Sequence, residues 1–380
     1  MSKIFSKKGT IILLIFIPAL FLLLYLNRDR IIPLFFAQQT PQGVDQGMKT
    51  EELPEGEIEI VMENLDIPWE ITFISEQEFL VSQRPGSVLY VQNNEIASLF
   101  EIESVRHIGE GGLLGMALHP QFDQNRYVYL YLTVDDANGV ENMVLRYTLE
   151  GTELTNEFVV LENIPGARTH NGGRIAFGPD GYLYITTGDA QEVNLSQETN
   201  SLAGKILRVT DEGDIPEDNP FGNEVYSYGH RNPQGIMWDS EGNLWSTEHG
   251  PTARDELNLI LPGENYGWPE IRGDEEQEGM VTPVLHSGDN YTWAPSGGVY
   301  WDGSIFFGGL RGSAIYEARL GENNEVSEFL IHFDGEFGRI RNVQLGPDGM
   351  MYILTNNTDG RGSPIEEDDR IIRINPGMFR

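Results

Sequence analysis

Residues 178–189 read GPDGYLYITTGD, a polar turn followed by a short strand and a second turn that ends in Asp189. Pro, Asp and Gly favour the turn, and the alternating aromatic and aliphatic side chains favour the strand. The same phrase recurs at residues 239–251 (DSEGNLWSTEHGP), 301–312 (WDGSIFFGGLRG) and 346–357 (GPDGMMYILTNN), and more weakly at residues 74–86 and 119–133. About six copies, spaced by roughly 45 to 60 residues, match the period of a four-stranded propeller blade.

The composition favours the same all-β architecture. The chain contains 43 Gly and 20 Pro, and its apolar runs after the N-terminal region are short and alternating, so long amphipathic helices have little room. We therefore predict an all-β fold over residues 57–376, a six-bladed β-propeller of four-stranded blades. In such a ring the inner strands converge on a central channel, and loops that are distant in sequence meet on one face.

Charge and cysteine content exclude several classes of function. The chain has 380 residues, no Cys, and a formal net charge of -34 from 25 basic and 59 acidic residues. This charge repels phosphate and argues against a nucleic-acid partner. The absence of Cys excludes disulfides, thiolate nucleophiles and Cys-ligated metal centres. A solvated acidic surface, calcium affinity and adaptation to high salt are all compatible with the acidity.

The N-terminus has the order of a secretory signal or a signal anchor. Three Lys residues precede an apolar run at residues 11–26, and a charged NRDR segment follows it. We expect residues 1–30 to form a membrane-anchor helix or a signal peptide, and the bulky Phe35 favours the uncleaved anchor. Residues 31–56 are then a linker, polar from Gln38 onwards. The domain that follows is expected to be extracytoplasmic, membrane-anchored or, if cleaved, secreted.

Six Gly-, Pro- or Asn-rich segments beside the predicted strands carry polar residues that a sheet does not need for its own stability. They are GEGGLLG (109–115), THNGGR (169–174), TGD (187–189), GHRNPQG (229–235), TEHGP (247–251) and GRIRNV (338–343). His170 can accept a proton near neutral pH, and Asp189 ends the next strand, where it can orient the imidazole. A turn His bonded to backbone and a turn Asp are the structural alternatives.

Arginines recur in the later segments. Arg231 beside Asn232 suits planar recognition of a carboxylate or quinone oxygen. Arg311, Arg339 and Arg341 add cationic donors, and the alternation of the last two places both on one strand face. In so acidic a chain this set indicates a bound anion, with scattered surface arginines as the alternative.

The segment HGPTARDELNLI (249–260) carries a different and weaker pattern. Its Gly-Pro turn frees backbone carbonyls, and Asp255 and Glu256 lie close by, so a hard cation such as calcium could bind there. Acidic turns are frequent throughout the chain. No GxGxxG segment follows a strand and opens a helix, so a dinucleotide cofactor of Rossmann type is not indicated.

The order of these motifs closely resembles the soluble pyrroloquinoline-quinone (PQQ)-dependent glucose and aldose sugar dehydrogenases. The resemblance runs from about residue 65 to residue 374 through GEGGLLGMALHPQF, HNGGRIAFGPDGYLYITTGD, LAGKILRV, GHRNPQG, TEHGP, DELNLILPGENYGWP and GRIRNVQLGPDGMMYILT. It implies a six-bladed propeller that holds PQQ over the channel mouth, with calcium bound to cofactor and protein. It also implies that an aldose is oxidised at its anomeric carbon by hydride transfer to the quinone, with His170, assisted by Asp189, as the general base.

The resemblance assigns twelve further positions to cofactor or metal. The expected cofactor-binding residues are Glu110, Arg231, Asn232, His249, Thr292, Arg311, Arg339 and Arg341. The expected metal ligands are Gly250 and Pro251, through their carbonyls, at the cofactor's calcium, and Glu256 and Tyr266 at a structural calcium. Arg311 stands where the family has a Lys, which keeps the charge but changes the geometry, and His249 stands where it has a Gln.

We therefore predict a PQQ- and calcium-dependent aldose sugar dehydrogenase that produces the lactone and passes electrons to an unknown acceptor. A calcium-dependent lactonase on a similar propeller is one alternative, although a neutral lactone does not need the arginine set. A non-catalytic extracellular ligand-binding propeller is the other, because one fold can host many activities. The sequence leaves open which sugar is oxidised and whether the protein is a monomer or a homodimer.

Overall fold

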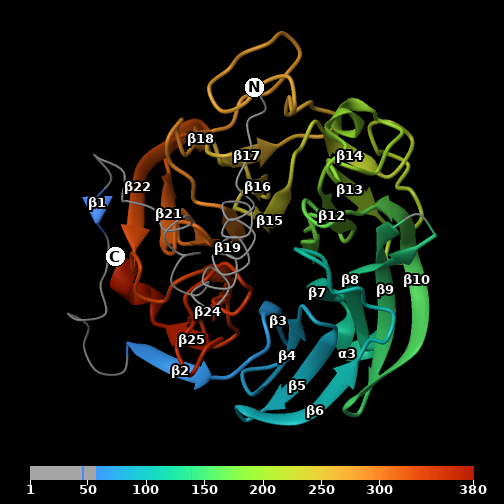
Figure 1. Cartoon of the computed structure of the whole chain (residues 1–380), viewed down its shortest axis with the longest axis vertical. Coiled ribbons are helices and arrows are strands. Elements are labelled where there is room, and N and C mark those ends of the chain that lie inside the picture. The colour runs from blue at the N-terminus through green and yellow to red at the C-terminus, as the bar shows by residue number, and fades with distance from the viewer. Residues whose placement is uncertain (1–44, 47–56, 138) are drawn as a thin grey trace, which may run out of the picture.

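The repeated phrases form the same piece of structure in every copy, namely the turn after the innermost strand of a sheet and the second strand that follows. The computed structural model describes residues 45–46 and 57–380 except residue 138. In it, six sheets surround a common centre (Figure 1). The four main strands of each blade are antiparallel to their neighbours, and a short fifth strand pairs parallel to the edge of one blade. This arrangement confirms the predicted six-bladed β-propeller of four-stranded blades.

The first three blades follow one another in the chain. The first contains β3 (Pro68–Phe73), β4 (Glu78–Gln83), β5 (Ser87–Gln92) and β6 (Glu95–Glu101). The second contains β7 (Leu113–Leu118), the short helix α3 (Phe122–Asn125), β8 (Tyr127–Asp136), β9 (Gly139–Glu150) and β10 (Glu153–Pro165). The third contains β11 (Ile175–Phe177), β12 (Leu183–Thr187), the 3-10 helix η2 (Val193–Gln197), β13 (Lys205–Val209) and β14 (Val225–Tyr228).

The other three blades continue around the ring. The fourth contains β15 (Pro233–Trp238), β16 (Leu244–Glu248), β17 (Glu256–Ile260) and β18 (Leu285–His286). The fifth contains β19 (Pro295–Trp301), β20 (Ser304–Gly309), β21 (Ile315–Leu320), the 3-10 helix η3 (Glu322–Asn324), β22 (Val326–His332) and, parallel to β22, β1 (Asp45–Gln46). The sixth contains β23 (Ile340–Leu345), β24 (Met351–Thr355), β25 (Ile371–Ile374) and β2 (Ile58–Met62), and the 3-10 helix η4 (Pro376–Phe379) follows β25.

The sixth blade joins the two ends of the domain. Its outermost strand, β2, comes from the N-terminal side and pairs antiparallel with β25, so that Ile58 lies opposite Ile374. The ring is therefore closed by hydrogen bonds between distant parts of the chain, which leaves no open seam between the first and last blades.

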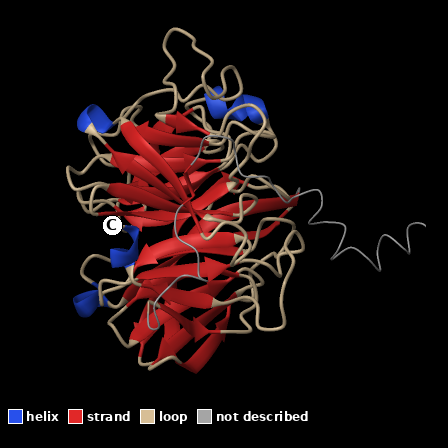
Figure 2. Ribbon diagram, turned by 90° about the vertical axis from the view of Figure 1, so that its left-hand side faces the viewer, coloured by secondary structure: helices blue, strands red, loops and turns tan. Residues whose placement is uncertain are grey.

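The hydrophobic core is divided among the blade interfaces. Five apolar clusters of described residues each join two adjacent blades, and a sixth joins the second and third blades and includes Trp69 of the first. Figure 2 shows the strands stacked through the depth of the propeller with loops at both faces. All five residues of β12 are buried, because a blade is covered on both of its faces by neighbours. This explains why the second strand of each phrase is a nearly continuous apolar run.

Most of the predictions for the N-terminal region fall outside the described residues. Residues 1–30, the expected anchor or signal, are outside the described residues, and only residues 45–46 of the expected linker are described. Within the described part of the chain, no helix is both long enough and apolar enough to cross a membrane.

Candidate active site

The topology of the blades gathers the polar loops on one face. The start of each inner strand pairs with the end of the second strand, as Pro233 does with Glu248 and Pro68 with Gln83. A loop that precedes an inner strand and a loop that follows a second strand therefore lie at the same end of the channel. The six polar segments predicted from the sequence occupy these two kinds of position.

His170 and Asp189 form a hydrogen-bonded pair at this end. Nδ1 of His170 lies 2.8 Å from Oδ1 of Asp189, and the indole Nε1 of Trp268 donates to the other carboxylate oxygen at 2.9 Å. Asp189 is fully buried, whereas the His170 side chain is 20% exposed. Gly188 permits this approach, because a Cβ on it would lie 1.9 Å from the His170 carbonyl oxygen.

The second imidazole nitrogen contacts an arginine. An Nη2 donor of Arg231 lies 2.9 Å from Nε2 of His170. Since a guanidinium can only donate, Nε2 must accept, and the ring proton must then lie on Nδ1 and point to Asp189. The pair therefore presents a neutral imidazole whose Nε2 lone pair faces the site, the tautomer required of a general base.

A buried relay of side chains holds the main chain of Arg231. The backbone N–H of Arg231 donates to Glu248, and the same carboxylate accepts from Nδ1 of His230 at 2.8 Å. Nε2 of His230 lies 2.8 Å from the Ser227 hydroxyl. All three supporting side chains are buried, so this Ser-His-Glu set positions the GHRNPQG segment and is not itself reachable by a substrate.

Glu110 connects His170 to the opposite side of the channel mouth. One carboxylate oxygen accepts the backbone N–H of His170 at 3.1 Å, and the other accepts from Arg361 at 2.6 Å. His170 has a φ of +62°, a left-handed conformation that a non-glycine residue needs such contacts to hold. Burial of Glu110 opposes its ionisation, but the charge and hydrogen bond of Arg361 outweigh it and lower the pKa of Glu110 to about 2.

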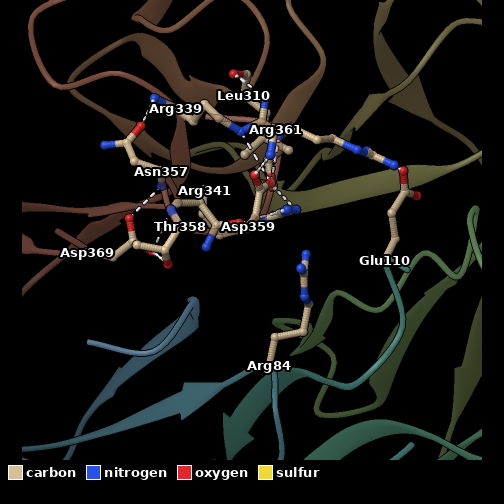
Figure 3. Close-up of polar contacts among 12 residues, drawn as sticks. Arg84, Glu110, Leu310, Arg339, Arg341, Asn357, Thr358, Asp359, Arg361 and Asp369 are labelled. Carbon is tan, nitrogen blue, oxygen red and sulfur yellow. Dashed lines mark hydrogen bonds and ion pairs between the residues drawn. The ribbon is translucent and has the colours of Figure 1, made fainter. Parts of the chain in front are cut away.

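The last blade contributes a cluster of arginines, drawn in Figure 3. Arg339 is paired with Asp359 at 2.7 Å and donates to the Leu310 carbonyl at 2.9 Å. Arg341 lies deeper and donates to Gln234 at 2.7 Å. Arg84 from the first blade points toward the same cluster (Figure 3) and is 4% exposed.

Most of the predicted residues meet around one cavity of about 170 Å³. The predicted residues on its wall are Glu110, His170, Arg231, His249, Gly250, Pro251, Thr292, Arg311 and Arg339. Three others, Asp189, Asn232 and Arg341, are buried behind this wall. The structure thus brings the proposed base and the proposed anion-binding groups together, while their individual roles stay predictions.

Oxygen donors suited to a hard cation lie beside this cavity. Glu256 and Tyr266 line a smaller neighbouring cavity that shares Gly250 and Pro251 with the first. Glu248 and Glu256 are directly opposed on β16 and β17, and burial, together with the Glu248 charge, raises the pKa of Glu256 to about 8. Among the described residues no group of three or more His, Cys, Asp or Glu side chains is arranged to hold a metal. The resemblance assigns the cofactor's calcium to the carbonyls of Gly250 and Pro251 and a second, structural calcium to Glu256 and Tyr266, and both assignments stay predictions.

Three charged residues of the mouth were missed by the sequence reasoning. Arg84 directly follows the second strand of its blade, as His249 does in the fourth blade, so comparing the residue after each second strand would have found it. Asp359 and Arg361 lie further along the loop after β24, where the repeated phrase gives no signal. Trp268 lies in the segment DELNLILPGENYGWP, and no local signal in this segment connects its indole to Asp189.

The fold and the site define a class, a six-bladed propeller whose channel mouth combines a His–Asp base pair with a set of arginines. A family model described as Glucose / Sorbosone dehydrogenase matches residues 65–372, and the chain belongs to this family.

Relatives and solved structures agree with the family assignment. The chain is 32% identical to Aldose sugar dehydrogenase YliI of Escherichia coli, with 80% of this chain and 91% of the relative covered. The PQQ-bound form of an aldose sugar dehydrogenase from Streptomyces coelicolor is 37% identical with a TM-score of 0.77, covering 84% of this chain and 97% of that one. The soluble aldose sugar dehydrogenase of Escherichia coli, in its apo-form, is 30% identical with a TM-score of 0.75, covering 84% and 99%.

Proposed function

We propose that this protein oxidises aldose sugars at the anomeric carbon to the lactone, with PQQ and Ca²⁺ as cofactors and His170 as the general base. The observation that carries the proposal is the imidazole of His170, held by Asp189 at Nδ1 with Nε2 toward a cavity that Arg231, Arg311 and Arg339 also line. The aldose sugar dehydrogenases among the relatives and solved structures support it.

The residues present fit an anionic quinone. Three buried polar atoms beside the cavity have no hydrogen-bond partner among the described residues, namely Nε of Arg231, Nδ2 of Asn232 and Nε2 of His249. Buried polar groups without partners are costly unless a ligand satisfies them. Burial lowers the pKa of His249 to about 3, with the charges of Arg231 and Arg341 acting in the same direction, so this ring is neutral. Arg339 is the donor suited to a cofactor carboxylate.

His170 would do the proton chemistry. The anomeric hydroxyl gives its proton to Nε2 while the hydride leaves the carbon, and Asp189 stabilises the imidazolium that forms. Because Arg231 occupies Nε2, its guanidinium must exchange this hydrogen bond for another acceptor before Nε2 can take the proton. When bound, PQQ polarised by Ca²⁺ would supply the two-electron hydride acceptor that no side chain offers.

The proposal is tested by reconstitution of the full chain with PQQ and Ca²⁺. We expect a change in the PQQ absorption spectrum on binding, and reduction of an artificial dye when glucose or another aldose is added. Both events should require the two additions together, and a calcium chelator present during reconstitution should prevent them. Tight binding without turnover of any aldose would favour a ligand-binding propeller, and no PQQ binding would sink the proposal.

We also propose that the domain works outside the cytoplasm. The support is the order of basic, apolar and charged segments in residues 1–30. Protease added to spheroplasts, from which the outer barriers have been removed, should digest the domain. A domain that is digested only after the cytoplasmic membrane is lysed would contradict the proposal.

A further inference from the structure

The ion pair between Glu110 and Arg361 joins the second and sixth blades, the two neighbours of the first blade, at the channel mouth (Figure 3). Glu110 precedes β7 in the second blade, and Arg361 follows β24 in the sixth. The pair is 2.6 Å long and only partly buried, with the side chains 18% and 40% exposed. Both residues line the same cavity as His170 and Arg231. The pair is therefore accessible to a ligand that reaches the base.

The position of this pair relative to the base is fixed. The carboxylate oxygen of Glu110 that does not bind Arg361 accepts the backbone N–H of His170 at 3.1 Å. Movement of Glu110 would therefore disturb the residue that carries the base. A sugar whose anomeric hydroxyl lies at Nε2 of His170 must place its neighbouring hydroxyl on one side of the base. Glu110 lines the same cavity as His170 and contacts its backbone.

The charge state of the pair favours a neutral ligand over an anion. Arg361 is neutralised by Glu110 and offers its remaining N–H donors beside a carboxylate acceptor. A donor and an acceptor side by side suit a hydroxyl, which both donates and accepts. Arg341 is 4% exposed and hydrogen-bonds to the neutral side chains of Gln234, Ser296 and Asn356, so its guanidinium is better suited to an anion.

We infer that the Glu110–Arg361 pair recognises the hydroxyl on the carbon next to the reacting anomeric carbon, so that Arg361 is a specificity-determining residue for 2-hydroxy aldoses. This inference rests on the proposed function. Arg361 then contacts the sugar, whereas the buried Arg339 and Arg341 bind the cofactor.

The test compares glucose with 2-deoxyglucose in the reconstituted wild type and in Arg361→Met. Intrinsic reactivity differs between the two sugars, but it is the same in both proteins, so a change in the ratio of their kcat/KM values isolates the contact. A hydrogen bond to a charged group contributes about tenfold to hundredfold. We expect the glucose preference to fall by about tenfold or more in Arg361→Met and to be partly kept in Arg361→Lys, which retains charge without the planar fork.

A binding measurement separates recognition from turnover. 1,5-Anhydroglucitol lacks the anomeric hydroxyl and cannot be oxidised to a lactone, and its 2-deoxy form differs only at the hydroxyl in question. Titration of the holoenzyme with both should show a preference that Arg361→Met loses. The matched control is Arg106→Gln, because Arg106 forms a 3.2 Å pair with Asp135 with side chains 51% and 73% exposed, away from the cavity wall. It should keep the wild-type ratio.

Each outcome supports or overturns the inference. An unchanged ratio in an Arg361→Met protein that still oxidises both sugars overturns the inference alone. Loss of PQQ affinity by tenfold with an unchanged sugar ratio would assign Arg361 to the cofactor and also overturns it. A wild type that binds PQQ but oxidises no aldose overturns the proposed function, and the inference falls with it. If Arg361→Met does not fold, as seen by its Tm, Arg361→Lys decides between the same outcomes.

Discussion

The two ends of the channel differ in chemistry more than in shape. The cavity at the loop face measures about 170 Å³ and is lined by His170, Glu110 and several arginines. The cavity at the other end is larger, about 650 Å³, and its wall is mostly apolar, with Phe73, Met116 and Phe177 among its side chains. Cavity volume alone would therefore point to the end of the channel that lacks the predicted base.

Charges occur at both ends, but they are used differently. At the far end, Glu70 pairs with Arg174, and both are buried. The Arg174 guanidinium also lies 4.0 Å from the centre of the Trp69 ring, and Arg341 lies 5.5 Å from it. The far pair also leaves one buried donor, Nη2 of Arg174, without a hydrogen-bond partner among the described residues. The difference is that no His lines the far cavity, whereas the mouth combines unpartnered donors with the base His170.

Removal of the base should separate the two ends of the channel most strongly. His170→Ala should lower kcat by about a hundredfold to ten-thousandfold, the range expected of a general base, while PQQ still binds. Gln344→Ala, at the wall of the far cavity, should leave kcat within twofold of the wild type. Dye-linked turnover with saturating PQQ and Ca²⁺ measures both. Equal losses in the two variants would mean that the ends are not functionally distinct.

A smaller effect is expected from Trp268, which orients Asp189. Trp268→Phe keeps an aromatic ring but removes the 2.9 Å hydrogen bond to Asp189, so kcat should fall about tenfold with little change in KM. In the double variant with Asp189→Asn the two losses should not add, because both act through the same imidazole.

The chain provides a matched control for this change. Trp245 donates an indole hydrogen bond of the same 2.9 Å length to Asp239, in the turn between β15 and β16 at the other face of the propeller. Trp245→Phe should lower Tm and leave kcat of the folded protein unchanged. A drop in kcat as large as that of Trp268→Phe would show that the loss reflects packing rather than the orientation of the base.

The propeller could be predicted because each repeat is a short, continuous stretch of sequence. Each copy joins a turn rich in Gly and Asp to an apolar strand such as β12, and both features arise from contacts that recur in every blade. The same logic placed His170 and Asp189 at one end of a blade, since antiparallel neighbours bring a strand start beside a strand end.

The remaining parts of the site depend on contacts across the ring, which no local pattern encodes. Glu110 meets Arg361 over a separation of 251 residues, and Trp268 reaches Asp189 over 79. Which donor turns to which acceptor depends on loop conformation, as with Arg339, which bonds to Asp359. Periodicity could have indicated the position of Arg84, which directly follows β4, but not that of Arg361, which lies further along the loop after β24.

The two Glu–Arg pairs should make folding stability depend on pH in opposite directions. The pKa of Glu110 is lowered from 4.5 to about 2, so its ionised form stabilises the fold above pH 4.5, and this contribution is lost as the pH falls toward 2. Burial raises the pKa of Glu70 above 4.5, so the folded state holds its proton more tightly than the unfolded state. Ionisation of Glu70 therefore reduces stability as the pH rises above 4.5.

Unfolding free energies of wild type, Glu110→Gln and Glu70→Gln, measured by denaturant from pH 3 to 7, test the opposite signs. From pH 3 to 4.5 the wild type should gain stability relative to Glu110→Gln, by about 1–2 kcal/mol in total. Above pH 4.5 it should lose stability relative to Glu70→Gln. Parallel curves would mean that solvent screens the mouth and the interior alike.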